Sequence, residues 1–285
     1  TSEQTIKGIQ TERIVLGCAQ PGQNVAVFED VLKRLRDRLH YLYSEHDRFW
    51  LEIKPNLRRE MESRKQNISK LEELQPLLKE RVGKVFGRSH CFGGIHVFTP
   101  SVDVPDDFGP GPRLVVLPPS AAYSRVDSSQ AFEAAEEILR NRGGQPRQKQ
   151  NRLIFVAADY DVVNRLEDHG KTLLAWQSIV ADAKAEKLTL TIPLIRQAER
   201  SVTGSEQSFQ QVLRETYKWL ICPVEHLVSG KPKLSWEAIS VSPAAANLVL
   251  EIENTLREEE WLIFDWSPIH LKNMLQQWYL KDGVT

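Results

Sequence analysis

The sequence has few cysteines and no long hydrophobic run, and both absences narrow the class of protein. The three cysteines, Cys18, Cys91 and Cys222, lie far apart and form no CxxC pair. An odd number of widely spaced cysteines argues against a disulfide framework and favours a reducing compartment, so we expect a cytoplasmic protein. No apolar run approaches the roughly 20 residues that a membrane span requires, so we expect no contact with a membrane.

The sequence also lacks an excess of charge of either sign. Its 37 Lys and Arg residues balance 38 Asp and Glu residues, which gives a formal net charge of −1. The chain as a whole therefore has no field that would hold DNA or an anionic membrane, and any contact with nucleic acid must be local. With 285 residues, the chain is long enough to bury one large core or two modest ones.

We expect no targeting signal in the N-terminal residues given, TSEQTIKGIQTER. They have neither the apolar stretch of a signal peptide nor the Arg-rich amphipathic pattern of a transit peptide. Because the chain opens without Met and stops after KDGVT, we expect it to be an excised piece of a longer protein.

Short apolar runs alternate with helical periodicity through the first 180 or so residues. The helical segments include one whose apolar positions fall at 27, 28, 31, 32, 35, 39 and 42. Strands are predicted at 13–17, 48–53, 93–99, 113–119 and 151–159. Nearly continuous apolar strands separated by helices are typical of a mostly parallel sheet covered on both faces. We predict an α/β domain over residues 1–202 with a P-loop or RecA-like architecture.

The remaining residues predict a mainly helical subdomain over 203–285, with its boundary at the polar stretch TGSEQS. The segment SFQQVLRETYKWLICP has helical periodicity, and two later segments each open with Ser-Pro, an N-cap followed by a proline at the first helical position. Five of the seven tryptophans lie at Trp219 or later. They either fill the core between short helices or form a docking surface for another domain.

Residues 17–24, GCAQPGQN, follow a predicted strand and precede a predicted helix. Gly17 and Gly22 have the spacing of the glycines in a phosphate-binding loop. A working loop needs Lys after the second glycine and then Ser or Thr to hold Mg²⁺, whereas this sequence has Gln23 and Asn24. Two interpretations stay open: an ordinary strand-to-helix turn, or a degenerate phosphate site that uses backbone amides at the helix N-terminus. No catalytic residue and no metal site are predicted.

Asp159 closes the predicted strand LIFVAAD, at the carboxyl edge where an α/β sheet presents polar groups to a ligand. It is a second candidate for sensing a phosphate or a water molecule. Asp is also a common N-cap, so a cap on the helix that begins near residue 161 is the alternative.

The loop of residues 140–152, RNRGGQPRQKQNR, is the best candidate for nucleic-acid binding. It contains no acidic residue and five basic ones: Arg140, Arg142, Arg147, Lys149 and Arg152. Because no aromatic residue is present to stack on bases, a charged, solvated loop is the alternative. Residues 54–88 are also basic, with ten Lys or Arg against five Glu, and the alternative there is the solvated face of a long helix.

Four ordered blocks of the sequence carry a family resemblance. They are RIVLGCAQPGQNVAVFEDVLKRLRDRLHYLYSEHDRFWLEIKPNLRR, then IHVFTP…VPDD…RLVVLPPSAAYSR, then QNRLIFVAADYDVVNRLEDHGKTLLAWQSI, and finally LRETYKWLICP. Together they resemble a large prokaryotic family of AAA-type ATPases that is catalogued as a domain of unknown function. Members of that family are often encoded beside DNA methyltransferases and helicases in restriction-like and phage-defence gene clusters. The resemblance covers most of the chain and weakens after about residue 230.

The resemblance implies that the chain is a non-catalytic C-terminal module of an AAA-like ATPase linked to DNA modification or phage defence. The family's intact phosphate-binding loop lies upstream of the matched part, so ATP and Mg²⁺ are expected there and no cofactor is expected in this chain. Enzymatic activity of the chain itself is left open. The expected partners are the rest of the parent ATPase and DNA or DNA-modification proteins. The alternative function is a nucleic-acid-binding module that uses residues 140–152.

Overall fold

The computed structural model describes residues 8–39, 41–45, 47–51, 56–86, 90–107, 109–126, 129–188, 190–228, 231–243, 247–262, 267–269 and 272. These residues divide into two compact units, each built from two separate stretches of the chain. The first unit takes its residues from 1–78 and 165–211, and the second from 79–164 and 212–285. The predicted boundary between residues 202 and 203 falls inside one helix, α7 (Ile192–Thr216).

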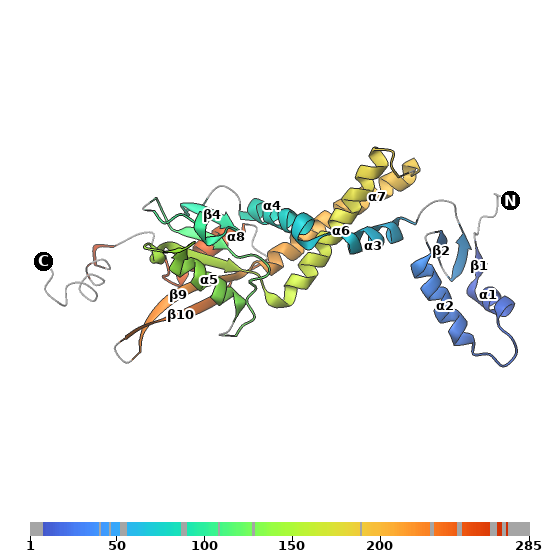
Figure 1. Cartoon of the computed structure of the whole chain (residues 1–285), viewed down its shortest axis with the longest axis horizontal. Coiled ribbons are helices and arrows are strands. Elements are labelled where there is room, and N and C mark those ends of the chain that lie inside the picture. Colours follow the sequence, from blue (N-terminus) through green and yellow to red (C-terminus); the bar gives the residue numbers. More distant parts are fainter. Residues whose placement is uncertain are drawn as a thin grey trace. The chain divides into compact units, whose positions relative to one another are not determined.

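The first unit begins with a small sheet and two helices, which we call the N-terminal lobe (residues 8–51). The sheet is antiparallel with the order β1-β3-β2. Its strands are β1 (Ile9–Gln10), β2 (Leu42–Glu45) and β3 (Arg48–Leu51), and its helices are α1 (Thr11–Cys18) and α2 (Val25–Arg38), all in blue at the N-terminal end of Figure 1. The predicted strand at 48–53 is confirmed for its described residues.

The predicted strand at 13–17 is wrong, because these residues lie in α1. Val15 points inward and is buried, whereas Leu16 next to it is 82% exposed. A run of three apolar residues is too short for its periodicity to distinguish a strand from a helix.

The rest of the first unit is helical. It contains α3 (Leu57–Asn67), a short π-helix (Lys70–Leu74) and parts of α4 (Gln75–Phe86), α6 (Tyr160–Lys184) and α7. Its core consists of small and aliphatic side chains from α3, α6 and α7: Leu57, Met61, Ala175, Ile179 and Ala198. The helical residues of 56–86 are interrupted at 68–69, and the turn that directly precedes α4 is the π-helix.

The second unit is built on a five-stranded mixed sheet with the order β10-β9-β8-β5-β4. Strands β4 (Gly94–Val97), β5 (Arg113–Val116) and β8 (Leu153–Ala157) are parallel, which confirms three predicted strands and the α/β class. Strands β9 (Trp219–Val228) and β10 (Lys231–Ser240) add an antiparallel hairpin. Helices α5 (Gln130–Arg140) and α8 (Leu248–Glu258), parts of α4, α6 and α7, and the two-residue strands β6 (Asn141–Arg142) and β7 (Gln145–Pro146) complete the unit.

The core of the second unit explains why its parallel strands have continuous apolar sequences. All five residues of β8 are buried, so both faces of the sheet are covered there. One face packs against α5, whose Ala131, Ala135 and Leu139 belong to the same buried cluster as Val115 and Phe155.

The predicted mainly helical part at 203–285 contains the end of α7 and helix α8, but also the hairpin of β9 and β10, which was not predicted (orange in Figure 1). The helix predicted over 208–223 ends at Thr216. In β10, Leu234, Trp236 and Ala238 pack against the α5 cluster, which is the two-residue alternation of a half-buried strand. Helix α8 begins at Leu248 with Asn247 as its N-cap, and most of the second Ser-Pro segment lies outside the described residues.

Two further parts of the predicted fold need correction. The sheet is mixed and not mostly parallel, because β8–β9 and β9–β10 are antiparallel pairs. The described residues give no sign of a P-loop or RecA-like architecture, since residues 17–24 join two helices and belong to no strand of the large sheet. None of the described helices combines the length and the apolar character needed to cross a membrane.

Candidate functional site

The turn at residues 17–24 connects α1 to α2 in the N-terminal lobe. Gly17 lies in the last turn of α1, and Gly22 has a φ of 89°, a left-handed conformation that favours glycine. The side chain of Gln23 accepts a hydrogen bond from the Gln20 amide at 3.0 Å, and Asn24 caps α2 by accepting from the Ala26 amide at 3.0 Å. Both polar side chains thus stabilise a helix-to-helix turn. Anion binding at this turn stays a prediction.

Asp159 lies just after β8, at the carboxyl edge of the parallel strands, and its side chain is only 2% exposed. One oxygen accepts from the Asp161 amide at 3.0 Å, so the N-cap interpretation is confirmed. The other oxygen contacts three donors: Lys218 Nζ at 2.9 Å, Arg125 Nη2 at 3.0 Å and Trp219 Nε1 at 3.1 Å. We call these five residues, Arg125, Asp159, Asp161, Lys218 and Trp219, the edge cluster.

The edge cluster holds Asp159 in its charged form. Burial alone would raise the pKa of this carboxyl, but hydrogen bonds from Lys218 and Trp219 outweigh burial and lower the pKa below its usual range. Arg125 bridges Asp159 and Asp161 and lies over the Trp219 ring, with its guanidinium carbon 5.4 Å from the ring centroid. The four charges balance, so the cluster is suited to fixing the geometry of this edge and has no net charge with which to attract an ion.

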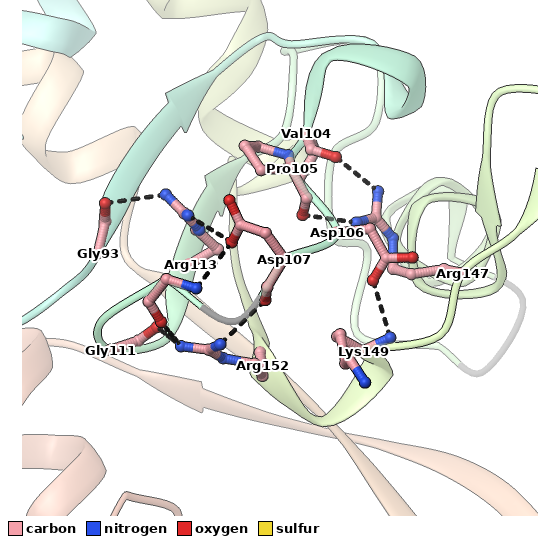
Figure 2. A network of polar contacts seen from close by, with 11 residues as sticks. Gly93, Val104, Pro105, Asp106, Asp107, Gly111, Arg113, Arg147, Lys149 and Arg152 are labelled. Carbon is pink, nitrogen blue, oxygen red and sulfur yellow. Dashed lines mark hydrogen bonds and ion pairs between the residues drawn. The ribbon is translucent and has the colours of Figure 1, made fainter.

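Arg147, from the predicted nucleic-acid loop, is buried inside the second unit. Only 3% of its surface is exposed. Its guanidinium donates to four backbone carbonyls, those of Ser101, Val104, Pro105 and Ile138, at 2.8–3.2 Å, and Figure 2 shows two of these contacts. A guanidinium surrounded by carbonyl groups in this way stabilises the connection between β4 and β5 and is not available to a phosphate.

Arg113 and Arg152 hold the same connection from its other end. Arg152 donates to the carbonyls of Asp107, Gly109 and Gly111, and Arg113 binds the Asp107 carboxylate at 2.8 Å (Figure 2). Hydrogen bonding to Arg113 lowers the pKa of Asp107. We call Arg113, Arg147 and Arg152 the loop clamp.

Three of the predicted nucleic-acid residues lie at or near the surface. Arg140 is paired with Glu136 at 2.6 Å and is 58% exposed, and exposed Arg142 donates to the Val102 carbonyl at 3.2 Å. The Lys149 amide, with that of Gln148, binds the Asp106 carboxylate. The structure therefore separates the five predicted residues into two inside the loop clamp and three outside it.

Three basic residues in the middle of the stretch at 54–88 are paired with acidic partners within the first unit. Arg64 contacts Glu60 and Asp182 at 2.8 and 2.6 Å, and hydrogen bonds to these carboxylates raise its pKa despite partial burial. Lys65 pairs with Asp168 at 2.7 Å, and Lys70 pairs with Glu167 at 2.6 Å. This pairing favours a structural role for the middle of the stretch.

The feature that sequence reasoning missed is an exposed apolar row on α2. Val27, Val31, Leu35 and Leu39 recur every four residues and are 57%, 44%, 38% and 43% exposed. The neighbouring Phe28 and Leu32 are partly buried, so α2 has two adjacent apolar rows and the lobe covers one of them. The signal was present in the apolar positions at 27, 28, 31, 32, 35 and 39, which form a wider stripe than a lobe of this size can bury. We call Val27, Val31, Leu35 and Leu39 the α2 row.

Within the described part of the chain, no group of three or more His, Cys, Asp or Glu side chains is arranged to hold a metal ion. Comparisons with protein-family profiles, with curated proteins and with solved structures found no match. The resemblance to AAA-type ATPases therefore stays a prediction from the sequence blocks.

Proposed function

We propose that this chain is a non-catalytic docking module of an AAA-type ATPase linked to DNA modification or phage defence. The observation that carries the proposal is the α2 row, an apolar surface on a helix of the N-terminal lobe. Exposed apolar side chains that form a contiguous row, and do not occur singly, mark interaction sites in soluble domains. The edge cluster and the loop clamp support a non-catalytic role, because their charged groups are engaged by contacts within the fold.

The proposed partner of the α2 row is the ATPase portion of the same parent protein. The row is flanked on one side by Asp30, Arg34 and Arg38, with Asp30 and Arg34 paired at 2.8 Å. Such an apolar centre with a charged margin is the usual composition of a protein–protein interface. ATP and Mg²⁺ are proposed to bind only in the upstream portion of the parent, as the sequence resemblance implies.

The test uses the reading frame in which this chain is encoded. An upstream phosphate-binding loop with an intact Lys and Ser or Thr is expected, and the portion that contains it should bind this chain in isothermal titration calorimetry. Leu35→Asp places a charge in the centre of the row and should weaken binding by about tenfold or more, because a desolvated charge in an apolar interface costs at least ~1.4 kcal/mol.

The matched control is Leu16→Asp. Leu16 is even more exposed, at 82%, and lies on α1 of the same lobe, outside the α2 row. It should leave the affinity unchanged. An absent upstream ATPase portion, an absence of binding, or equal loss in both variants would each reject the proposal.

A second candidate function, nucleic-acid binding, is supported by the exposure of Arg140 and Arg142. With the loop clamp unavailable, these two arginines and Lys149 could contact at most a few phosphates, so affinity should be weak and steeply dependent on salt. A fluorescence titration with single- and double-stranded oligonucleotides at low salt tests this function. Binding that the double variant Arg140→Gln, Arg142→Gln abolishes would favour it over docking.

A further inference from the structure

A cavity of about 580 Å³ in the first unit brings together three arginines from two elements. Arg36 comes from α2, and Arg58 and Arg59 come from the first turn of α3. The described lining residues include one carboxylate, Glu62. The three arginines and this glutamate together give these residues a formal charge of +2. We propose that this cavity binds a small molecule that carries a phosphate group.

Arg59 carries an unsatisfied buried donor. Nη1 of Arg59 is buried and has no hydrogen-bond partner among the described residues. An unpaired buried N–H of a charged group costs free energy, and a rotation of the Arg59 side chain toward a ligand oxygen in the cavity would recover it. This situation differs from that of Arg64, one turn further along α3, whose guanidinium contacts two carboxylates.

The side chains that line the cavity suit the oxygens of a phosphate group. Guanidinium groups present several N–H donors in a planar fork that matches the oxygens of a phosphate. Tyr43 and Ser44 also line the cavity, and their side chains carry hydroxyl groups, which are neutral hydrogen-bonding groups. The cavity is thus polar and positively charged, which does not suit an apolar ligand.

The N-terminal end of α3 and the size of the cavity also suit a small anion. Asn56 accepts from the Arg58 and Arg59 amides, so these amides are already used, but the positive end of the α3 dipole still adds to the field in the cavity. A volume in this range is typical of small-molecule sites. We therefore assign the site to a small phosphomonoester and not to a nucleic-acid strand. This inference does not depend on the proposed docking function.

The experiment measures binding of inorganic phosphate and of adenosine monophosphate to the full chain by calorimetry. Saturable binding is expected for the phosphomonoester. Arg59→Gln should weaken it by about tenfold or more, because a charge-assisted hydrogen bond is lost. Glu62→Gln should strengthen it, because the one carboxylate among the described lining residues is neutralised.

Arg200→Gln is the matched control, since it removes one exposed arginine of α7, in the same unit but outside the cavity lining, and should leave phosphate affinity unchanged. Glu62 is exposed, so its variant keeps the inference testable even if Arg59→Gln fails to fold. The proposal is overturned if neither probe binds at millimolar concentration, or if Glu62→Gln does not raise the affinity. It is also overturned if an oligonucleotide binds at this cavity while both small probes do not.

Discussion

The loop clamp and the edge cluster both use arginine, yet the two regions of the second unit employ its guanidinium in different ways. In the loop clamp, Arg147 is buried and its partners are neutral backbone carbonyls. In the edge cluster, Arg125 is 52% exposed and its partners are two carboxylates and an indole ring. Basic residues in a loop therefore do not by themselves indicate nucleic-acid binding, because carbonyl and carboxylate groups of the same fold can already accept their hydrogen bonds.

The two regions should also differ in energetic weight. Four carbonyl groups around Arg147 would be left without a donor if its side chain were removed, and each unsatisfied buried acceptor is costly. Arg125 leaves partners that solvent or Lys218 can serve, because its own side chain is half exposed and Lys218 also contacts Asp159. Substitutions should therefore separate a buried stabilising role from an exposed one.

The largest effect is expected for Arg147→Met. The variant fills much of the same volume but removes every hydrogen bond, and we expect the free energy of unfolding to fall by about 3 kcal/mol or more. Arg142→Met, from the same loop, should change it by no more than about 0.5 kcal/mol because Arg142 is exposed. Urea denaturation followed by circular dichroism measures both. A similar loss of unfolding free energy in the two variants would contradict the difference between buried Arg147 and exposed Arg142.

An intermediate effect is expected for Asp159→Asn, which keeps the shape of the side chain but removes its charge. We expect a loss of about 2 kcal/mol at neutral pH, because Lys218 loses its buried partner. The pKa of Asp159 is lower in the folded than in the unfolded state, so the contribution of its charge is complete above the unfolded value of about 4.

That contribution should be lost as the pH falls through the lowered pKa of the folded state. The stability difference between the wild-type chain and Asp159→Asn should therefore be constant from neutral pH to about pH 5 and shrink at lower pH. Denaturation curves at a series of pH values check this. A difference that grew with acidification would show that the charge of Asp159 destabilises the fold.

The smallest effect concerns the backbone of Arg125, which has a φ of 59°. Residues other than glycine rarely adopt this left-handed conformation. Arg125→Gly and Arg125→Ala lose the same side-chain contacts, but glycine relieves the strain. We therefore expect the Gly variant to have a melting temperature about 2 °C above that of the Ala variant, measured by scanning calorimetry. The opposite order would place the strain elsewhere.

Parallel strands β5 and β8 of the second unit could be predicted, because a strand that is buried on both faces has apolar residues at consecutive positions. LVVL and LIFVA are apolar at every position, and the structure buries both segments. Strand β10 was not predicted, because its two faces differ and Leu234, Trp236 and Ala238 are separated by polar residues. The alternation of apolar and polar residues in β10 is present in the sequence. The helical periodicity of the segment at 208–223 nevertheless favoured a helical prediction for the whole of 203–285.

The candidate sites were predictable to a lesser degree. The segment LIFVAAD predicts the position of Asp159 at the end of a strand. Its partners Arg125 and Lys218, however, are 34 and 59 residues away along the chain. No local pattern indicates such contacts. The burial of Arg147 was hidden for the same reason, since its acceptors are carbonyl groups that every residue possesses. The exposure of the α2 row depends on how much apolar surface of α2 the lobe can bury, and the local sequence of α2 does not contain this information.

Helices α4, α6 and α7 each contribute residues to both compact units, and each unit draws on two distant stretches of the chain. A single truncation anywhere from residue 79 to residue 211 would consequently remove part of both. Dissection of this protein into independently expressed halves is therefore the wrong strategy. A property can be assigned to one unit by point substitutions in the intact chain. It can also be assigned with a fusion in which a designed linker joins 79–164 to 212–285.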